Sequence, residues 1–154
     1  MRSLGRVDHL AAGALGPPGK RTFYLEVDGP GGREWFVVEK EQVSALAAHG
    51  LKLVRTPETS STNPGPAMGT PGEPTFRVGE IGLGSDGEEV VVLLSPTEEG
   101  EPVAFTVAPG VFAAMARRAL EVVAGGRPLC GFCGLPEDSD GHACPAGNGD
   151  LRRR

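Results

Sequence analysis

The chain lacks the long apolar run that a membrane-spanning helix requires, since no stretch of about 18 apolar residues occurs among its 154 residues. It has a net charge of −5 and no basic cluster before its last residues, which argues against wholesale binding to a nucleic-acid backbone. Asp8 and His9 fall where a secretory signal would need continuous apolar sequence. We therefore expect a cytoplasmic protein, with no membrane partner and with reduced thiols.

The common catalytic signatures are also missing. The sequence has no G-x-S-x-G, no P-loop, no G-x-G-x-x-G that opens a helix, and no H-x-E or C-x-E of the kind a zinc deaminase needs. Asp8 could orient His9 as a base, but neighbours in a strand point to opposite faces. His49 is expected near the end of a helix, where it would interact with the terminal carbonyls. No catalytic residue is predicted, and whether the protein is an enzyme stays open.

Cysteine is scarce, and all three cysteines lie in one short C-terminal stretch. They form the pattern C-x2-C-x8-H-x-C together with one histidine, and the four residues are Cys130, Cys133, His142 and Cys144. Thiolate and imidazole are the ligands that Zn²⁺ prefers, and four protein ligands are typical of a structural site. The spacing therefore predicts a zinc site, in which the short H-x-C arm makes His142 the ligand that fits least well.

Other interpretations of the cysteines remain open. They could form a disulfide with one spare thiol, although their number is odd and no secretion signal is present. Cys130 and Cys133 could be a redox pair, which would require a helix that starts at the motif. The cluster could also have arisen by chance. If His142 were not a ligand, three cysteines and a water would leave an open and catalytic zinc site.

Glycine and proline are abundant, with 24 and 14 residues, but they are concentrated in a few places. They gather at 16–19, 28–32, 63–74 and in the C-terminal loop, so the segments between these positions can still fold. The length suits one domain of ordinary size. We expect a core over 1–126, a linker over 51–75 within it, a zinc loop over 127–149 and a tail over 150–154.

An internal duplication is predicted within the core. Residues 22–47 align without a gap on residues 91–116, and both stretches have the pattern of two strands followed by an alanine-rich helix. A weaker match upstream adds a third strand to each copy. The predicted fold class is α+β, with two β-β-β-α units at 7–50 and 76–125 that are related by a pseudo-two-fold. Convergence of two common patterns is the alternative.

Alternating apolar residues define the expected strands. These strands are 7–13, 23–27, 34–39, 76–83, 90–94 and 103–107. Tyr24 and Glu26 are expected on the face opposite the core, while Trp35 and Val37 hint at a second buried surface. The first helix is predicted over 40–49 with its end at Gly50. The second begins at Pro109 and ends at residues 125–126.

Several segments resemble bacterial proteins grouped as domain of unknown function 3090. They are the opening through Gly13–Phe23, then Glu39–Val43, Phe76–Gly79 and Arg127–Gly149. The resemblance covers nearly the whole chain except 51–75, and the cysteine motif is its most specific part. It implies a single-domain cytoplasmic protein with a zinc site, and it implies no particular activity.

The favoured function is a non-catalytic binding or adaptor module that holds a protein or a small ligand in the groove between the two units. One rival is an enzyme that uses this groove, with a phosphorylated substrate bound by Lys20, Arg21 and Arg77. The other rival is nucleic-acid contact through the zinc loop and the terminal arginines. The acidic residues of that loop oppose the second rival.

Overall fold

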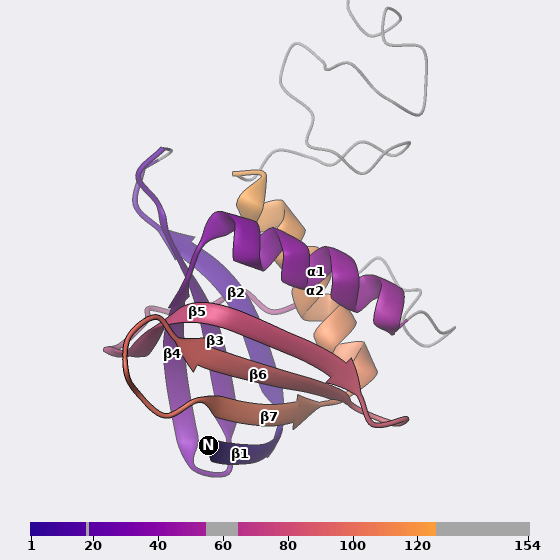
Figure 1. The fold of residues 1–154 in the computed structure, drawn as a ribbon. Helices are drawn as coiled ribbons and strands as arrows, with labels where there is room; N and C mark the ends of the chain where they lie inside the picture. Colours follow the sequence, from indigo (N-terminus) through magenta and orange to yellow (C-terminus); the bar gives the residue numbers. More distant parts are fainter. Residues whose placement is uncertain (18, 55–64, 126–154) are drawn as a thin grey trace, which may run out of the picture.

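The computed structural model describes residues 1–17, 19–54 and 65–125, and in them one mixed sheet packs against two helices (Figure 1). This arrangement confirms the α+β class. The strands are β1 (Arg2–Val7), β2 (His9–Leu15), β3 (Thr22–Gly29), β4 (Gly32–Val38), β5 (Pro74–Ser85), β6 (Val90–Pro96) and β7 (Val103–Val107). The helices are α1 (Lys40–Leu53) and α2 (Pro109–Val123).

The strand order across the sheet is β1-β7-β6-β5-β4-β3-β2. Neighbours along the chain pair antiparallel within β2-β3-β4 and within β5-β6-β7, whereas β4 pairs parallel with β5 and β1 pairs parallel with β7. A parallel pair needs a long crossover. α1 and the residues after it provide that crossover between β4 and β5.

The first strand, β1, was not expected from the sequence. It lies at one edge of the sheet and β2 lies at the other edge, yet only Asp8 separates them in the chain. The sheet must therefore curl until its two edges meet at this end. The meeting point is visible in the hydrogen bond from the Asp8 N–H to the Asp28 carbonyl of β3, at 3.2 Å.

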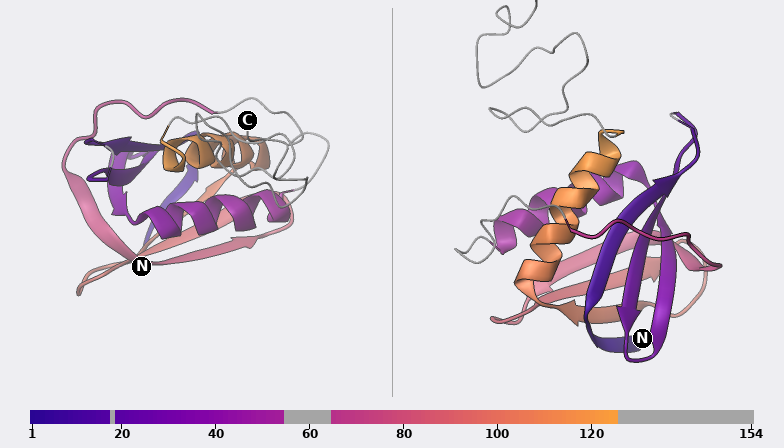
Figure 2. Two further views of the ribbon diagram at one scale, coloured as in Figure 1. Left: turned by 90° about the horizontal axis from the view of Figure 1, so that it is seen from above. Right: turned by 180° about the vertical axis from the view of Figure 1, so that it is seen from behind.

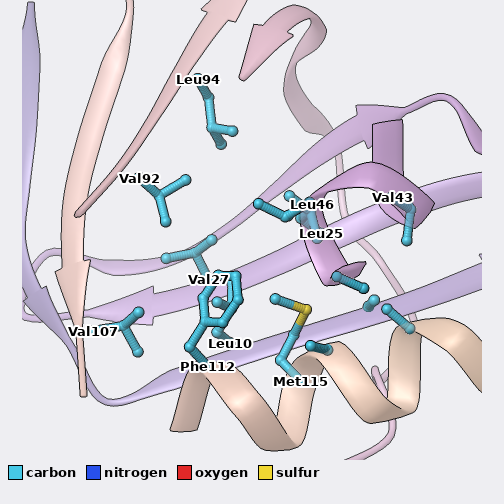
Figure 3. Close-up of a cluster of buried hydrophobic side chains, with 14 of the residues drawn as sticks. Leu10, Leu25, Val27, Val43, Leu46, Val92, Leu94, Val107, Phe112 and Met115 are labelled. Atoms are coloured by element: carbon cyan, nitrogen blue, oxygen red, sulfur yellow. The ribbon is translucent and has the colours of Figure 1, made fainter. Parts of the chain in front are cut away.

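Both helices lie on the same side of the curved sheet (Figure 2). They share one hydrophobic core with the strands, and Figure 3 shows apolar side chains from β2, β3, β6, β7 and both helices that point into it. Phe112 and Met115 of α2 are fully buried there, as are Leu10 and Leu25 from the strands. The core thus forms where the alternation of the strands predicts it.

The predicted end of the first helix is wrong. α1 does not stop at Gly50 but continues to Leu53. Gly50 is present because α1 crosses α2 closely there: a Cβ at this position would lie 1.9 Å from Cε1 of Phe112. The glycine is therefore a packing residue and not a helix terminator.

The predicted ends of the second helix are confirmed. Pro109 occupies its first turn, and Gly125 follows it with a positive φ of 72°, the left-handed conformation that commonly ends helices. This end is important for the site, because the cysteine-rich segment follows it in the chain.

The other face of β2-β3-β4 is covered as well. Residues 65–73, which we call the strap, cross this face on the way to β5 (Figure 2). A Cβ at Gly13 of β2 would lie 2.7 Å from Met68, and one at Gly72 would lie 2.6 Å from Trp35 of β4. Val37 is buried on this face, so the hint of a second buried surface is confirmed.

The predicted linker over 51–75 therefore has several parts in the structure. Residues 51–53 belong to α1, residues 74–75 belong to β5, and the strap lies between them. Its first residue is anchored to α2: the Gly65 N–H donates to the Ala114 carbonyl at 2.8 Å, and Arg118 Nε donates to the Gly65 carbonyl at 3.0 Å. Residues 55–64 of the predicted linker lie outside the described ranges.

Within the described ranges, neither helix is long and apolar enough to span a membrane.

Candidate functional site

The four predicted metal ligands, Cys130, Cys133, His142 and Cys144, lie outside the described residues. Within the described part of the chain, no group of three or more His, Cys, Asp or Glu residues is arranged to hold a metal ion. The structure does describe the place where the segment with the ligands leaves the core.

Arg21 marks this place. Its Nη1 donates to the Val122 carbonyl at 2.8 Å and its Nη2 donates to the Val123 carbonyl at 3.3 Å. A guanidinium suits this position because the C-terminus of a helix carries partial negative charge and unpaired carbonyls. The same guanidinium lies 5.0 Å from the centroid of the Phe23 ring, within the range of a cation–π contact. The end of α2 is thus tied to the start of β3.

A cavity of about 500 Å³ opens beside Arg21. It lies where β3 begins, where β4 passes into α1 and where Arg77 projects from β5. The lining residues are Gly19, Arg21, Thr22, Phe23, Val37, Val38, Glu39, Lys40, Glu41 and Arg77. Arg21 and Arg77, which are predicted to share one groove, both line it. Lys20, the third residue of that prediction, is not among them.

The lining of the cavity is charged. Three cations, Arg21, Lys40 and Arg77, face two carboxylates, Glu39 and Glu41. Arg77 Nη1 and Glu39 Oε2 lie 2.7 Å apart, and both side chains of this pair are more than half exposed. Positive charge is therefore in slight excess here, although the whole chain carries a net charge of −5.

The start of α1 is fixed at the rim of the same cavity. The Glu39 N–H donates to Gln42 Oε1 at 2.7 Å, which is half of a capping box. The Gln42 amide then donates to the Val78 and Gly79 carbonyls of β5, at 3.1 Å each. These bonds hold α1, β4 and β5 in fixed relative positions around the cavity.

A second polar cluster lies on the strap side of the sheet, around Glu26. This side chain was expected on an outer face, but it is 1 % exposed. Strand register explains the cluster, because Glu26 is paired directly with Trp35 of β4. His9 of β2 and Arg33 of β4 are both paired with Asp28, two residues further along β3, so they lie on the same face as Glu26. His9 Nε2 lies 2.8 Å from Glu26 Oε1, and Trp35 Nε1 donates to Oε2 at 2.9 Å.

The charge of Glu26 is stabilised by this cluster. Burial acts to raise the pKa of Glu26, but the hydrogen bonds from Trp35 and His9 and the charge of Arg33, 3.8 Å away, together lower that pKa below its ordinary value of 4.5. Both carboxylate oxygens already have donors, and Glu26 lines none of the cavities described here. The geometry is that of a structural carboxylate.

His9 was considered as a base oriented by Asp8. The structure gives it Glu26 as partner instead, because the two lie on adjacent strands and the same face. A partner on another strand could have been found only from the register of β2 and β3, which the sequence alone did not define.

An apolar groove of about 320 Å³ runs between α1 and β5. Its lining residues are Gln42, Ala45, Leu46, His49, Gly79, Ile81 and Leu83. His49, which was expected at a helix end, lies within α1 and borders this groove, because the helix continues to Leu53. Ile81 and Leu83 are only partly covered here, so the apolar surface of β5 is accessible at this point.

Fold and site together define a small α+β protein with one curved sheet, a polar cavity at the edge of its first helix and a cysteine-rich segment after its second. The chain belongs to the family described as Protein of unknown function (DUF3090), whose model matches residues 3–144. The resemblance stated from the sequence is thereby confirmed, and the matched region ends at Cys144, the last predicted ligand. No curated protein and no solved structure matches the chain.

Proposed function

We propose that the protein is a non-catalytic binding module of the cytoplasm whose C-terminal segment carries a structural zinc ion. Cys130, Cys133, His142 and Cys144 are the proposed ligands. Three thiolates and one imidazole are a donor set that suits tetrahedral Zn²⁺ and leaves no position for a reactive water. Zinc in comparable small sites contributes apparent free energies of about 10–16 kcal/mol to local folding.

The proposed binding role is supported chiefly by Arg21, which takes part in two features of the structure. It lines the cavity of about 500 Å³ and also holds the last carbonyls of α2, after which the cysteine-rich segment begins. A zinc-ordered segment that starts at this point would form one rim of the cavity. The ligand or partner would then be held between the core and the zinc loop.

We also infer that the groups 7–50 and 76–125 are two copies of a β-β-β-α unit related by a pseudo-two-fold. Support comes from the element order, in which three strands and a helix follow each other twice, and from the antiparallel pairing within each group. The cavity takes Arg21 from the first group and Arg77 from the second, as a site between such units would.

Native mass spectrometry of the reduced, purified protein tests the metal. We expect one zinc ion per chain, retained in a Ser139→Ala variant, which changes the same loop outside the ligand set, and lost in Cys144→Ser. A His142→Ala variant should bind zinc more weakly than the unchanged chain, because it loses one of four ligands. A protein that arrives folded and free of metal would overturn the zinc proposal.

A further inference from the structure

The chemistry of the cavity beside Arg21 indicates what it binds. Its volume of about 500 Å³ lies within the range of small-molecule sites, roughly 300–1,000 Å³. Such sites are usually lined mainly by apolar side chains, whereas charged residues make up half of this lining. A ligand that fits it must therefore carry charge of its own.

We propose that this ligand is a small molecule with a phosphate or a similar doubly charged anionic group, bound between Arg21 and Arg77. This inference rests on the proposed binding function, and it adds the chemical class of the ligand.

The guanidinium of Arg21 is already held in one orientation in the structure. A guanidinium has five N–H donors, and the two bonds to Val122 and Val123 use two of them. Those bonds and the contact with Phe23 fix the plane of the group, so little side-chain freedom remains to be lost on binding. Three N–H donors remain beyond these two bonds, and Arg21 lines the cavity.

Arg77 provides the second contact, because its present partner is easily replaced. The Arg77–Glu39 pair is exposed to solvent, with 55 % and 57 % of the two side chains accessible, and exposed pairs contribute little stability. A doubly charged phosphate group offers more charge than the single carboxylate of Glu39, and arginine binds phosphate with two parallel hydrogen bonds. Glu39 therefore occupies the position that the anion would take beside Arg77.

The two arginines also come from separate strands. Arg21 directly precedes β3, and Arg77 belongs to β5, with β4 between them in the sheet. Since the sheet fixes both backbone positions, the separation of the two Cα atoms is set by the fold. A bound anion would join the two halves of the sheet at this end.

Isothermal titration of the full zinc-loaded chain with pyrophosphate and with orthophosphate, at constant ionic strength, tests the proposal. We expect saturable binding that Arg77→Gln weakens by at least about tenfold, because a charge-assisted contact is lost. Arg6→Gln is the matched control: Arg6 also pairs with a glutamate, Glu89, but lies outside the cavity, and this variant should bind as the unchanged chain does.

A Glu39→Gln variant gives a result of opposite sign. Removal of the competing carboxylate should tighten binding of the anion, and a thermal unfolding curve of each variant confirms that it is folded. Absence of binding by the unchanged chain, or equal binding by Arg77→Gln and the unchanged chain, would overturn the inference.

These outcomes are separable from failure of the proposed function. Native mass spectra could instead show a neutral or cationic small molecule that is lost on Arg21→Gln substitution. That result would agree with the proposed binding function but would contradict the proposal of an anionic ligand. A purified chain that is folded and free of metal, yet binds pyrophosphate in a way that depends on Arg77, would contradict the zinc proposal only.

Discussion

Glu26 is a single residue that connects three strands and the strap. Its oxygens accept from His9 on β2 and from Trp35 on β4, and Gly69 of the strap lies close to Oε2. A buried carboxylate is costly unless its oxygens are hydrogen-bonded, and here both are. The cluster therefore fixes how β2, β3 and β4 are arranged beneath the strap.

The first residue-scale prediction is that Glu26→Gln destabilises the fold. Glutamine keeps the size of the side chain but carries no charge, so the charge-assisted hydrogen bonds with His9 and Trp35 and the attraction of Arg33 are weakened. We expect the free energy of unfolding to fall by about 1–3 kcal/mol, measured by urea denaturation. Glu88→Gln, an exposed control, should stay within about 0.5 kcal/mol. An equal effect of both variants would contradict the structural role.

The pH dependence of this effect follows from the lowered pKa of Glu26. A carboxyl group that is more acidic in the folded chain binds protons more readily in the unfolded chain, so stability rises with pH across the interval between the two values. Its contribution is fully present above the ordinary pKa of 4.5 and is lost as the pH falls through the lower folded value. The difference between the unchanged chain and Glu26→Gln, measured by urea denaturation at several pH values, should therefore shrink below about pH 4.5.

At the scale of elements, the crossing of α1 and α2 depends on one glycine. Gly50 of α1 faces the ring of Phe112 without room for a side chain, whereas a Cβ at Gly110 in the first turn of α2 would have nothing within 4 Å. A side chain is therefore excluded at Gly50 by the neighbouring helix, whereas there is open space for one at Gly110.

Alanine substitution should separate the two positions. Gly50→Ala gains helix propensity of about 1 kcal/mol but overpacks the crossing, and we expect a net loss of about 1–3 kcal/mol in unfolding free energy. Gly110→Ala should be neutral or should raise stability by up to about 1 kcal/mol. Thermal and urea unfolding of both variants measure the contrast, and a stabilised Gly50→Ala protein would show that the helices can separate without cost.

The elements also show what the sequence could and could not predict. The periodicity of apolar residues predicted six of the strands and both helices, because buried residues recur at every second position in a strand and every third or fourth in a helix. Pro109 and Gly125 predicted the ends of α2. The sequence pattern failed at Gly50, since a glycine needed for a close crossing looks in sequence like one that ends a helix. It missed β1, which is mostly exposed and has a bulge between Ser3 and Arg6, so no alternation is visible.

The candidate site was predictable only in part. Lys20, Arg21 and Arg77 were predicted to bind a phosphorylated substrate in the groove between the two units, and of these Arg21 and Arg77 line the cavity. The burial of Glu26 could not be predicted, because it depends on a partner in β4 and on a strap that looks like a linker in sequence. A low-periodicity stretch rich in Gly and Pro gives no signal of what it will cover.

At the scale of the whole molecule, the curled sheet is joined across its closing end by an ion pair. Arg2 of β1 donates to both oxygens of Glu34 on β4, at 2.7 and 2.8 Å, and Thr75 Oγ1 donates to the same carboxylate. The hydrogen bond from Arg2 lowers the pKa of Glu34, against a smaller opposing effect of burial. This bidentate pair connects strands that are not neighbours in the sheet.

Loss of this connection should weaken the whole fold slightly. We expect Arg2→Gln to lower the free energy of unfolding by about 0.5–1 kcal/mol, measured by urea denaturation, because the pair is bidentate and Glu34 is largely covered. Arg6→Gln, which breaks a more exposed pair with one contact, should cost less. A larger effect at Arg6 would mean that the Arg6–Glu89 pair, rather than the Arg2–Glu34 pair, holds this edge in place.

The position of β1 has a consequence for how the chain assembles during synthesis. Its partner is β7, and Arg2 pairs with Val103, so roughly 100 residues must follow it before its partner exists. Since synthesis proceeds from the N-terminus, β1 leaves the ribosome before the other described strands, yet it is among the last of them that can be paired. β1 therefore stays without its partner strand while the residues up to β7 are synthesised. β1 is mostly exposed, carries Arg2 and Arg6, and has a bulge and Gly5 between them. These features disfavour pairing of β1 with strands of other chains before β7 has been synthesised.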